Sequence, residues 1–201
     1  MTQACLFNGP TLRANWPFGS LAPMSADLIM ADPPWTFETY SAKGEGKSAQ
    51  RHYKVMTTKD ICALPVCELA KSDCLLWLWA TWPMLTDAMR VIDAWRFRYV
   101  TGGVWHKTTK TGKTAFGTGY RLRSASEPFL LATIGNPETT SSVRNVVVGK
   151  VREHSRKPEE GYVAAEALMP AAVRVEVFSR TNRPGWLSWG DEAGKFGEVA
   201  A

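Results

Sequence analysis

The pattern of apolar and polar positions predicts a sheet of buried strands joined by helices. Strands are expected at 28–31, 74–79, 97–105, 128–134, 146–148 and 173–177, and 173–177 is expected to be the last. The run 74–79 is apolar and aromatic throughout, as in strands covered on both faces, and therefore belongs at the sheet centre. A glycine pair at 102–103 is expected to mark a bulge in its strand.

Helices are expected between these strands, at 57–64, from Pro83 to Trp95 and at 159–169. Thr57 and Asp60 have the spacing of a capping box, and Pro65 ends the first helix. Strands that alternate with helices predict the α/β class. We expect a Rossmann-like fold, in which a single mixed sheet carries helices on both faces.

One turn in this pattern carries candidate chemistry. Asp32-Pro33-Pro34-Trp35 directly follows the strand 28–31, and ligand sites of open α/β sheets lie at the carboxyl ends of strands. The Asp32 carboxylate and the Pro33 carbonyl can each accept a hydrogen from an exocyclic amine of a base. That grip would pull a delocalised nitrogen towards tetrahedral geometry, and Trp35 could stack on the base.

Asp-Pro by itself is a common turn opener, so the dipeptide alone would favour an ordinary strand end. The full motif brings a carboxylate, a carbonyl and an aromatic ring to one sheet edge, which favours a functional site. A base held there must have left its helix or be single-stranded.

These four residues resemble the catalytic motif of the MT-A70 family, the N6-adenine methyltransferases that include the catalytic subunit of the eukaryotic mRNA adenosine methyltransferase and many phage and bacterial DNA enzymes. The resemblance extends from about Asp27 to about Glu192. Further matching segments are His52-Tyr53 with Met56, Trp77-x-Trp79-x-Thr81, Trp105-x-Lys107-Thr108, Gly119 with Glu127, Gly135-Asn136-Pro137, Arg152 to Ser155 with Lys157-Pro158, Glu176-x-Phe178-x-Arg180, Gly185-Trp186 and Trp189-Gly190. Each segment is weak alone, but the ordered set is specific.

The resemblance implies S-adenosylmethionine as the cofactor, bound between the strand that ends at Asp32 and a strand near the C-terminus. The implied cofactor-binding residues are Asp32, Lys107, Glu176, Arg180, Asn182, Arg183, Asp191 and Glu192. Lys107 and Asp32 would reach the methionine end. Asp191 and Glu192 stand where the family more often has amides, so they can accept hydrogen bonds but cannot donate them.

Two features weigh on this assignment. Glu176 could instead pair with a neighbouring arginine on the surface, which is the commoner outcome for isolated charges. The glycine-rich turn by which most methyltransferases hold their cofactor is missing, because Gly44-x-Gly46 and Gly117-x-Gly119 do not open a helix after a strand. That departure separates the chain from most methyltransferases and not from the MT-A70 family.

Substrate contacts are expected from a second set of residues. The resemblance implies Trp35, Tyr53, Arg121, Glu127, His154, Ser155 and Lys157 near the substrate. Independently, the segment 107–123 interleaves basic residues, among them Lys110 and Lys113, with aromatic ones, as a nucleic-acid backbone and unstacked bases require. The alternative for this segment is an ordinary solvated loop.

Composition limits the remaining classes. The 201 residues, 45% of them hydrophobic, predict one domain over 1–201 with an irregular segment at 1–25 and a frayed tail at 194–201. The net charge of +5 suits a polyanionic partner without requiring one. The longest apolar stretch, 74–85, is too short to cross a bilayer, and the N-terminus lacks a signal pattern, so a soluble cytoplasmic protein is expected.

Metal and nucleotide-hydrolysis chemistry are not favoured. The four cysteines lack C-x-x-C spacing and the histidines are scattered, so free thiols and no metal are expected. Segments 41–48 and 107–114 nearly match a phosphate-binding loop, but each lacks the first required glycine. The segment 36–53 between strand and helix is expected to lie over the site as a loop.

The sequence thus predicts an S-adenosylmethionine-dependent N6-adenine methyltransferase acting on nucleic acid, with DNA favoured over RNA. The alternative from another class is a non-catalytic nucleic-acid-binding partner with the same fold, which the intact Asp32 motif disfavours. A monomer, a homodimer and a requirement for a partner subunit all remain open.

Overall fold

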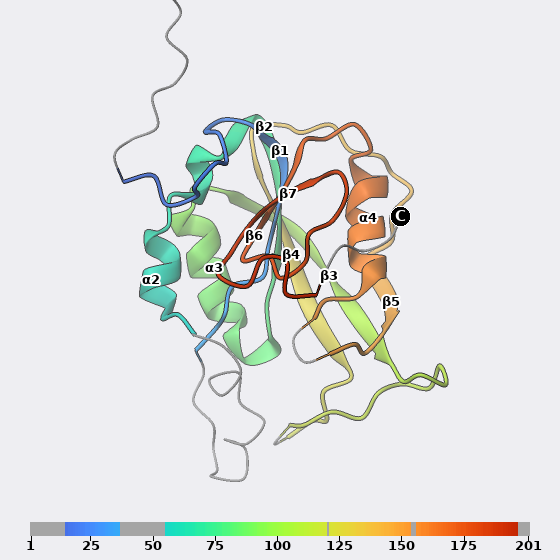
Figure 1. Ribbon diagram of the computed structural model, residues 1–201. Helices are drawn as coiled ribbons and strands as arrows, with labels where there is room; N and C mark the ends of the chain where they lie inside the picture. The colour runs from blue at the N-terminus through green and yellow to red at the C-terminus, as the bar shows by residue number, and fades with distance from the viewer. Residues whose placement is uncertain (1–14, 37–54, 120, 154–155, 197–201) are drawn as a thin grey trace, which may run out of the picture.

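The computed structural model describes residues 15–36, 55–119, 121–153 and 156–196 (Figure 1). Its strands form one seven-stranded sheet in the order β5-β3-β4-β2-β1-β6-β7. Their bounds are β1 Ala26–Ala31, β2 Ala70–Trp79, β3 Arg98–Thr108, β4 Ser126–Ile134, β5 Val146–Lys150, β6 Arg174–Val177 and β7 Trp186–Trp189. Strand β4 runs antiparallel to both of its neighbours and the other pairs are parallel, which confirms the mixed sheet.

The sheet centre agrees with the apolar pattern, whereas its edge does not. Strand β2 is fourth in the order and its last six residues, from Cys74 on, are buried, as predicted for 74–79. The prediction that 173–177 is the last strand was wrong, because β7 follows it and pairs with β6. The bulge in β3 lies between Tyr99 and Thr101 rather than at the glycine pair.

Helices cover the two faces of this sheet (Figure 1). Helices α2 (Thr58–Ala63) and α3 (Leu85–Ala94) lie on one face, and α4 (Glu159–Leu168) lies on the other. The Thr57 side chain accepts a hydrogen bond from the Asp60 amide at 3.1 Å, which confirms the predicted cap of α2. Helix α3 begins two residues after Pro83, because a 3₁₀ turn, η3 (Trp82–Met84), precedes it.

The two faces carry separate apolar cores. The core under α2 and α3 includes Ile29 of β1 and Trp95 after α3, and the core under α4 includes Met30 of β1 and Trp77 of β2. Neighbours such as Ile29 and Met30 fall in different cores because successive strand side chains point to opposite faces. Because β1 contributes side chains to both cores, its position in the sheet is fixed. Asp32 directly follows the end of this strand.

Candidate active site

A cavity of about 430 Å³ lies at the carboxyl ends of β1 and β6. These strands are parallel neighbours whose last residues, Ala31 and Val177, are in register, so the segments that follow both strands meet at one edge. Asp32 enters the cavity from β1. The cavity is lined by Asp32, Pro34, Val55, Met56, Asp60, Phe178, Ser179, Arg180, Trp189, Asp191 and Glu192.

Asp32 is the first of four charged side chains that are joined by ion pairs, with acids and lysines alternating. The Lys157 ammonium lies 2.8 Å from Asp32 Oδ1 and 2.7 Å from Glu127 Oε1. Lys107 Nζ lies 2.7 Å from the other carboxylate oxygen of Glu127. The resemblance implies that Lys107 and Asp32 both reach the methionine end of the cofactor; in the structure Lys157 pairs with Asp32, and Lys107 lies one carboxylate further along.

Burial and mutual attraction set the protonation of these charged side chains. Burial would lower the pKa of Lys157, but the carboxylates of Asp32 and Glu127 outweigh it and raise that pKa. Burial raises the pKa of the Asp32 carboxyl, with Lys157 opposing the shift. For Glu127, the two lysines outweigh burial and lower the pKa. Lys157 is therefore a permanent cation that holds Asp32 in place.

The rest of the motif is less open than the sequence indicates. The Pro33 carbonyl accepts a hydrogen bond from the Trp35 amide at 2.8 Å, which leaves one of its two lone pairs. The Trp35 ring is 5% exposed, lies in the core under α2 and α3, and donates from Nε1 to the Trp79 carbonyl. The predicted stacking role of Trp35 does not fit this placement, because a buried ring has no free face for a base.

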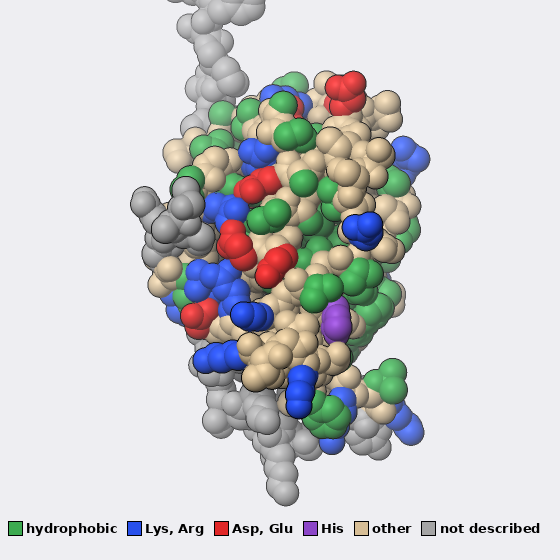
Figure 2. Space-filling view, turned by 90° about the vertical axis from the view of Figure 1, so that its right-hand side faces the viewer, with side chains coloured by type: hydrophobic (Ala, Val, Ile, Leu, Met, Phe, Trp, Pro, Cys, Tyr) green, Lys and Arg blue, Asp and Glu red, His purple; other side chains and the backbone are tan. Residues whose placement is uncertain are grey.

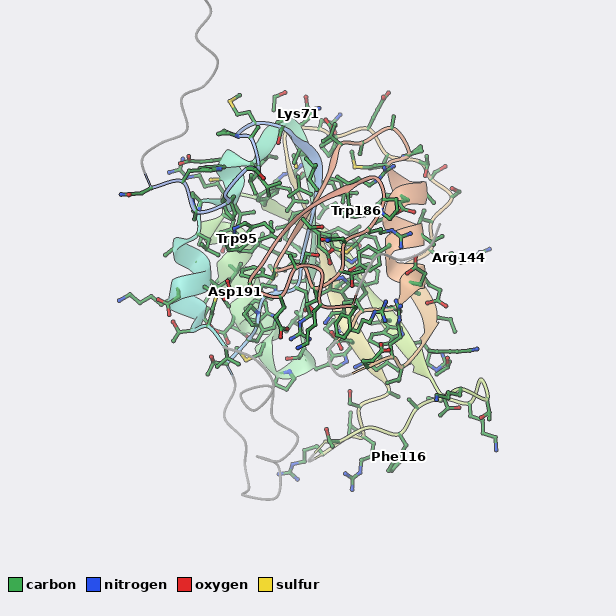
Figure 3. The ribbon with its side chains drawn as sticks, in the orientation of Figure 1. Lys71, Trp95, Phe116, Arg144, Trp186 and Asp191 are labelled. Carbon is green, nitrogen blue, oxygen red and sulfur yellow. The ribbon has the colours of Figure 1, made fainter. Side chains whose placement is uncertain are left out.

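Only part of the predicted cofactor set lines the cavity. Arg180 and Glu192 do so as an ion pair of 2.6 Å, and Asp191 joins them from the segment after β7 (Figure 3). Arg183 is instead paired with Glu159 and Glu166 of α4. Asn182 is exposed and, like Arg183, is not among the lining residues.

Glu176 is also absent from the lining. It lies on β6, is 6% exposed, and accepts hydrogen bonds from the Tyr162 hydroxyl at 2.5 Å and the Ser179 hydroxyl at 2.8 Å. Burial raises its pKa to about 7, against the effect of those two donors. The surface pairing considered for Glu176 does not occur, because its partners are buried hydroxyl groups.

The predicted substrate residues do not form one group: Glu127 and Lys157 lie beside Asp32, whereas the other basic ones lie elsewhere. Lys110, Lys113 and Arg121 are exposed on a projection between β3 and β4, and a bridge between Thr108 and Thr114 closes the turn that carries the two lysines. Tyr53, His154 and Ser155 lie outside the described residues, as does most of the predicted loop 36–53.

Sequence reasoning did not assign several cavity residues a role. Phe178 lines the cavity with φ of 67°, a strained backbone for a bulky residue. Gly190 lets the chain after β7 approach this turn, since a Cβ at that position would lie 2.7 Å from the Ser179 carbonyl oxygen. Both residues belong to the motif segments, and that membership was the only signal of their importance in the sequence.

Comparison with known proteins follows the same residues. A family model described as MT-A70 matches residues 26–192. The chain belongs to the MT-A70 family. An "N(6)-adenosine-methyltransferase MT-A70-like" protein of Arabidopsis thaliana is 32% identical over 174 residues, which cover 82% of this chain and 23% of the relative. The chain thus spans about a quarter of that relative's length.

Two other relatives differ in how much of them is matched. "Type II methyltransferase M.MunI" of Mycoplasma sp is 27% identical over 194 residues, 87% of this chain and 81% of that protein. Human "N(6)-adenosine-methyltransferase catalytic subunit METTL3" is 27% identical over 175 residues, 82% of this chain and 28% of that protein. The family match covers residues 26–192, which is the range over which the ordered motifs occur in the sequence.

Within the described ranges, no helix has the length and apolarity needed to cross a membrane. The same residues contain no group of three or more His, Cys, Asp or Glu side chains that could hold a metal ion.

Proposed function

We propose that this MT-A70 chain transfers a methyl group from S-adenosylmethionine to the N6 amine of adenine in nucleic acid, with DNA as the preferred substrate. The observation that carries the proposal is the Asp32 carboxylate, which borders a cavity while Lys157 holds only its Oδ1 atom by an ion pair. An acceptor fixed by a buried cation at a strand end is what a weakly nucleophilic amine requires.

The cavity lining fits the cofactor. Its volume of about 430 Å³ is within the usual range for small-molecule sites. Asp191 and Glu192 supply carboxylates that can accept from ribose hydroxyls or the adenine amine, and Phe178 and Trp189 supply aromatic surface. When bound, the cofactor would supply an electrophilic methyl group on a sulfonium.

The chain's own residues would act on the amine and its protons. One amine hydrogen would be accepted by Asp32 and the other by the remaining lone pair of the Pro33 carbonyl. Lys157 would keep the Asp32 carboxylate oriented and ionised. Neither task involves Trp35, whose ring is buried in the core under α2 and α3.

Nucleic-acid binding is assigned to the projection between β3 and β4. Blue side chains gather at the lower end of the face seen in Figure 2, towards this projection. Phe116 on this projection is 80% exposed, and the Arg123 guanidinium lies 5.5 Å from its ring centroid (Figure 3). Exposed cations beside an exposed ring can bind phosphates and an unstacked base together.

DNA is proposed ahead of RNA because of how much of each relative's length this chain matches. The chain matches 81% of M.MunI but 54% of a protein named "N6-methyladenosine RNA methyltransferase MTA1" from Cryphonectria parasitica. RNA methylation is the alternative, and a non-catalytic binding partner is the alternative from another class.

The direct test is labelled-methyl transfer to matched DNA and RNA oligonucleotides, single- and double-stranded, followed by nucleoside analysis, with Asp32→Ala as the inactive control. We expect N6-methyldeoxyadenosine from DNA with the native protein only. If only RNA yields a methylated product, N6-methyladenosine, then RNA and not DNA is the substrate. Binding without any methyl transfer would favour the non-catalytic alternative.

The nucleic-acid interface has its own test. Replacing Lys110 and Lys113 together with alanine should weaken binding similarly across sequences and reduce the salt slope by about one unit per lysine. Lys59 on α2 and Lys71 on β2 serve as a double control elsewhere on the molecule. Native salt dependence in the Lys110/Lys113 variant would mean that the projection is a solvated connection.

A further inference from the structure

The segment 190–196, which follows β7, forms a turn at the cavity beside Asp32, and we call it the post-β7 turn. It places Asp191 and Glu192 in the cavity lining (Figure 3). The Lys195 amide donates a hydrogen bond to the Glu192 carbonyl at 3.0 Å, which closes the turn behind these two acids. The position of both carboxylates at the cavity therefore depends on how this turn is held.

Arg180 is held by the post-β7 turn at two points. Its guanidinium pairs with Glu192 at 2.6 Å, and its carbonyl accepts a hydrogen bond from the Phe196 amide at 3.2 Å. Lys195 forms a further ion pair with Glu192. The turn and the segment after β6 are thus joined by one group of bonds at the cavity, and Phe196 belongs to that group.

The Phe196 side chain makes a contact with a different part of the molecule. The Arg156 guanidinium lies 4.9 Å from its ring centroid, which is a cation–π distance. Arg156 lies in the segment before α4, and its side chain is only 15% exposed. A guanidinium that is largely removed from water gains more from an aromatic face than an exposed one does.

Arg156 directly precedes Lys157, whose ammonium pairs with Asp32. The contact between Arg156 and Phe196 therefore joins two segments that both reach the site. One segment holds the carboxylate that is proposed to accept from the amine. The other carries the carboxylates that are proposed to bind the cofactor.

The family match does not extend to this contact. It ends at residue 192, so Lys195 and Phe196 lie beyond it, whereas Arg180 and Glu192 lie within it. The sequence resemblance thus gave no role to Phe196, and the inference below comes from its contacts alone.

We propose that Arg156 and Phe196 form a clasp that positions the post-β7 turn for cofactor binding. Neither residue lines the cavity, so both are positioning residues that act through Glu192 and Arg180. The inference rests on the proposed function and names the residues that preorganise its cofactor site. A turn already held in its binding geometry loses less conformational freedom when the cofactor arrives, which raises affinity.

The experiment is calorimetric titration of the full chain with S-adenosylmethionine, with methyl-transfer kinetics on the same proteins. Phe196→Ala removes the ring, Phe196→Leu keeps apolar bulk without an aromatic face, and Phe196→Tyr keeps that face. Arg156→Ala removes the cation, and Arg156→Ala with Phe196→Ala completes a double-mutant cycle. Arg90→Ala on α3 is the matched control, because Arg90 pairs with Asp87 at the same spacing and the same 3.1 Å as Arg156 with Glu153.

We expect cofactor affinity about fivefold weaker in Phe196→Ala, Phe196→Leu and Arg156→Ala, the equivalent of a cation–π contact of about 1 kcal/mol. The double variant should be no weaker than either single one, since each change alone opens the clasp. Phe196→Tyr and Arg90→Ala should bind as the native chain does. In Phe196→Ala the KM for the cofactor should rise while kcat at saturating cofactor stays near native, a split that a general loss of stability would not produce.

Several outcomes would overturn the clasp alone. They are native affinity in Phe196→Ala or Arg156→Ala, losses that add in the double variant, rescue by leucine as complete as by tyrosine, and an equal loss in Arg90→Ala. Circular dichroism checks folding, and if Phe196→Ala does not fold, Phe196→Leu against Phe196→Tyr decides the question. Absence of cofactor binding by the native chain would instead overturn the proposed function, and the clasp with it.

Discussion

Strands β1 and β6 are parallel neighbours that end side by side, yet the acids they carry there have opposite surroundings. Asp32, after β1, borders the cavity and has one oxygen held by Lys157. Glu176, on β6, has both oxygens occupied by Tyr162 and Ser179 and does not border the cavity. Both are carboxyl groups near adjacent strand ends, and the difference lies in whether their acceptor atoms face the cavity.

The two arginines after β6 repeat this contrast. Arg180 borders the cavity, where it pairs with Glu192. Three residues later, Arg183 packs over the Tyr162 ring at 5.0 Å and clamps the β6–β7 connection to Glu166 of α4. Chemistry is thus expected from Asp32 and Arg180, and scaffolding from Glu176 and Arg183. Variants of these residues test this division, and their expected effects on methyl transfer range from large to negligible.

Asp32→Asn should have the largest effect. It keeps the shape of the side chain but removes the charge that faces the amine, and loss of one such preorganised group typically costs about 10²–10³-fold in rate. The fold should persist, because Asp32 borders the cavity at a strand end. Labelled-methyl transfer and circular dichroism measure the two quantities. A folded Asp32→Asn protein with a near-native rate would remove Asp32 from the reaction.

Lys157→Gln should have the next largest effect, about tenfold or more, the value of a charge-assisted hydrogen bond. Burial already raises the pKa of Asp32, and Lys157 opposes that rise. Removing the lysine therefore raises the Asp32 pKa further. Because the carboxylate is the active form, the acidic limb of the pH–rate profile should move to higher pH.

A matched control is available at the other end of β1. Lys71 lies 2.8 Å from Asp27, far from Asp191 in Figure 3. Lys71→Gln breaks a similar pair without touching the cavity, so its pH–rate profile should be native. Equal shifts in both variants would point to a general change in charge rather than to Asp32.

These contrasts show where the sequence is informative. The apolar run of β2 predicted the sheet centre, and the polar turn after β1 predicted Asp32, because both are local patterns tied to general rules of sheet structure. Of the charged residues that the MT-A70 resemblance implied for the cofactor, Asp32, Arg180, Asp191 and Glu192 line the cavity, whereas Lys107, Glu176 and Arg183 do not. The motifs could not give the pairing of Lys157 with Asp32, which depends on how distant segments fold together.

The failures have physical causes as well. Strand β7 is as short as β6, but its sequence Trp-Leu-Ser-Trp does not alternate apolar and polar residues and only Trp186 is buried, so the local pattern does not mark it as a strand. Trp35 was predicted to stack on a base because the motif brings its ring to the sheet edge, but its amide bonds back to the Pro33 carbonyl and its ring lies in the core under α2 and α3. Side-chain direction after a turn is a tertiary property that local pattern does not fix.

Arg183→Ala should leave the methyl-transfer rate nearly native while lowering stability. The change leaves Glu159 and Glu166 without their common cation. A fully buried pair would cost about 3–5 kcal/mol, but Glu159 is 37% exposed and solvent screens it, so we expect about 2 kcal/mol. Denaturant unfolding measures this, with Arg180→Ala as control. A large loss of cofactor affinity in Arg183→Ala would mean that Arg183 belongs to the cofactor site and not to the scaffold.

Glu176→Gln should change the methyl-transfer rate least of these variants. Its effect should appear in the pH dependence of the free energy of unfolding. Burial raises the pKa of Glu176 from 4.5 to about 7 in the folded chain. The folded state thus holds this proton more tightly than the unfolded state, so the stabilisation is complete below the ordinary pKa of 4.5 and is lost as pH rises through about 7. Glutamine cannot ionise, and the decline should disappear.

The measurement is thermal unfolding of both proteins across this interval, with the slope compared rather than the midpoint. Glutamine carries an amide donor that meets the hydroxyl donors of Tyr162 and Ser179, so the absolute stability of Glu176→Gln can fall while its slope still flattens. Glu166→Gln on α4 is the control, because its pKa is lowered in the folded chain and removing it cannot flatten this decline. Parallel slopes in the native and Glu176→Gln proteins, together with weaker cofactor binding, would mean that Glu176 faces the ligand and that the two strand ends are alike.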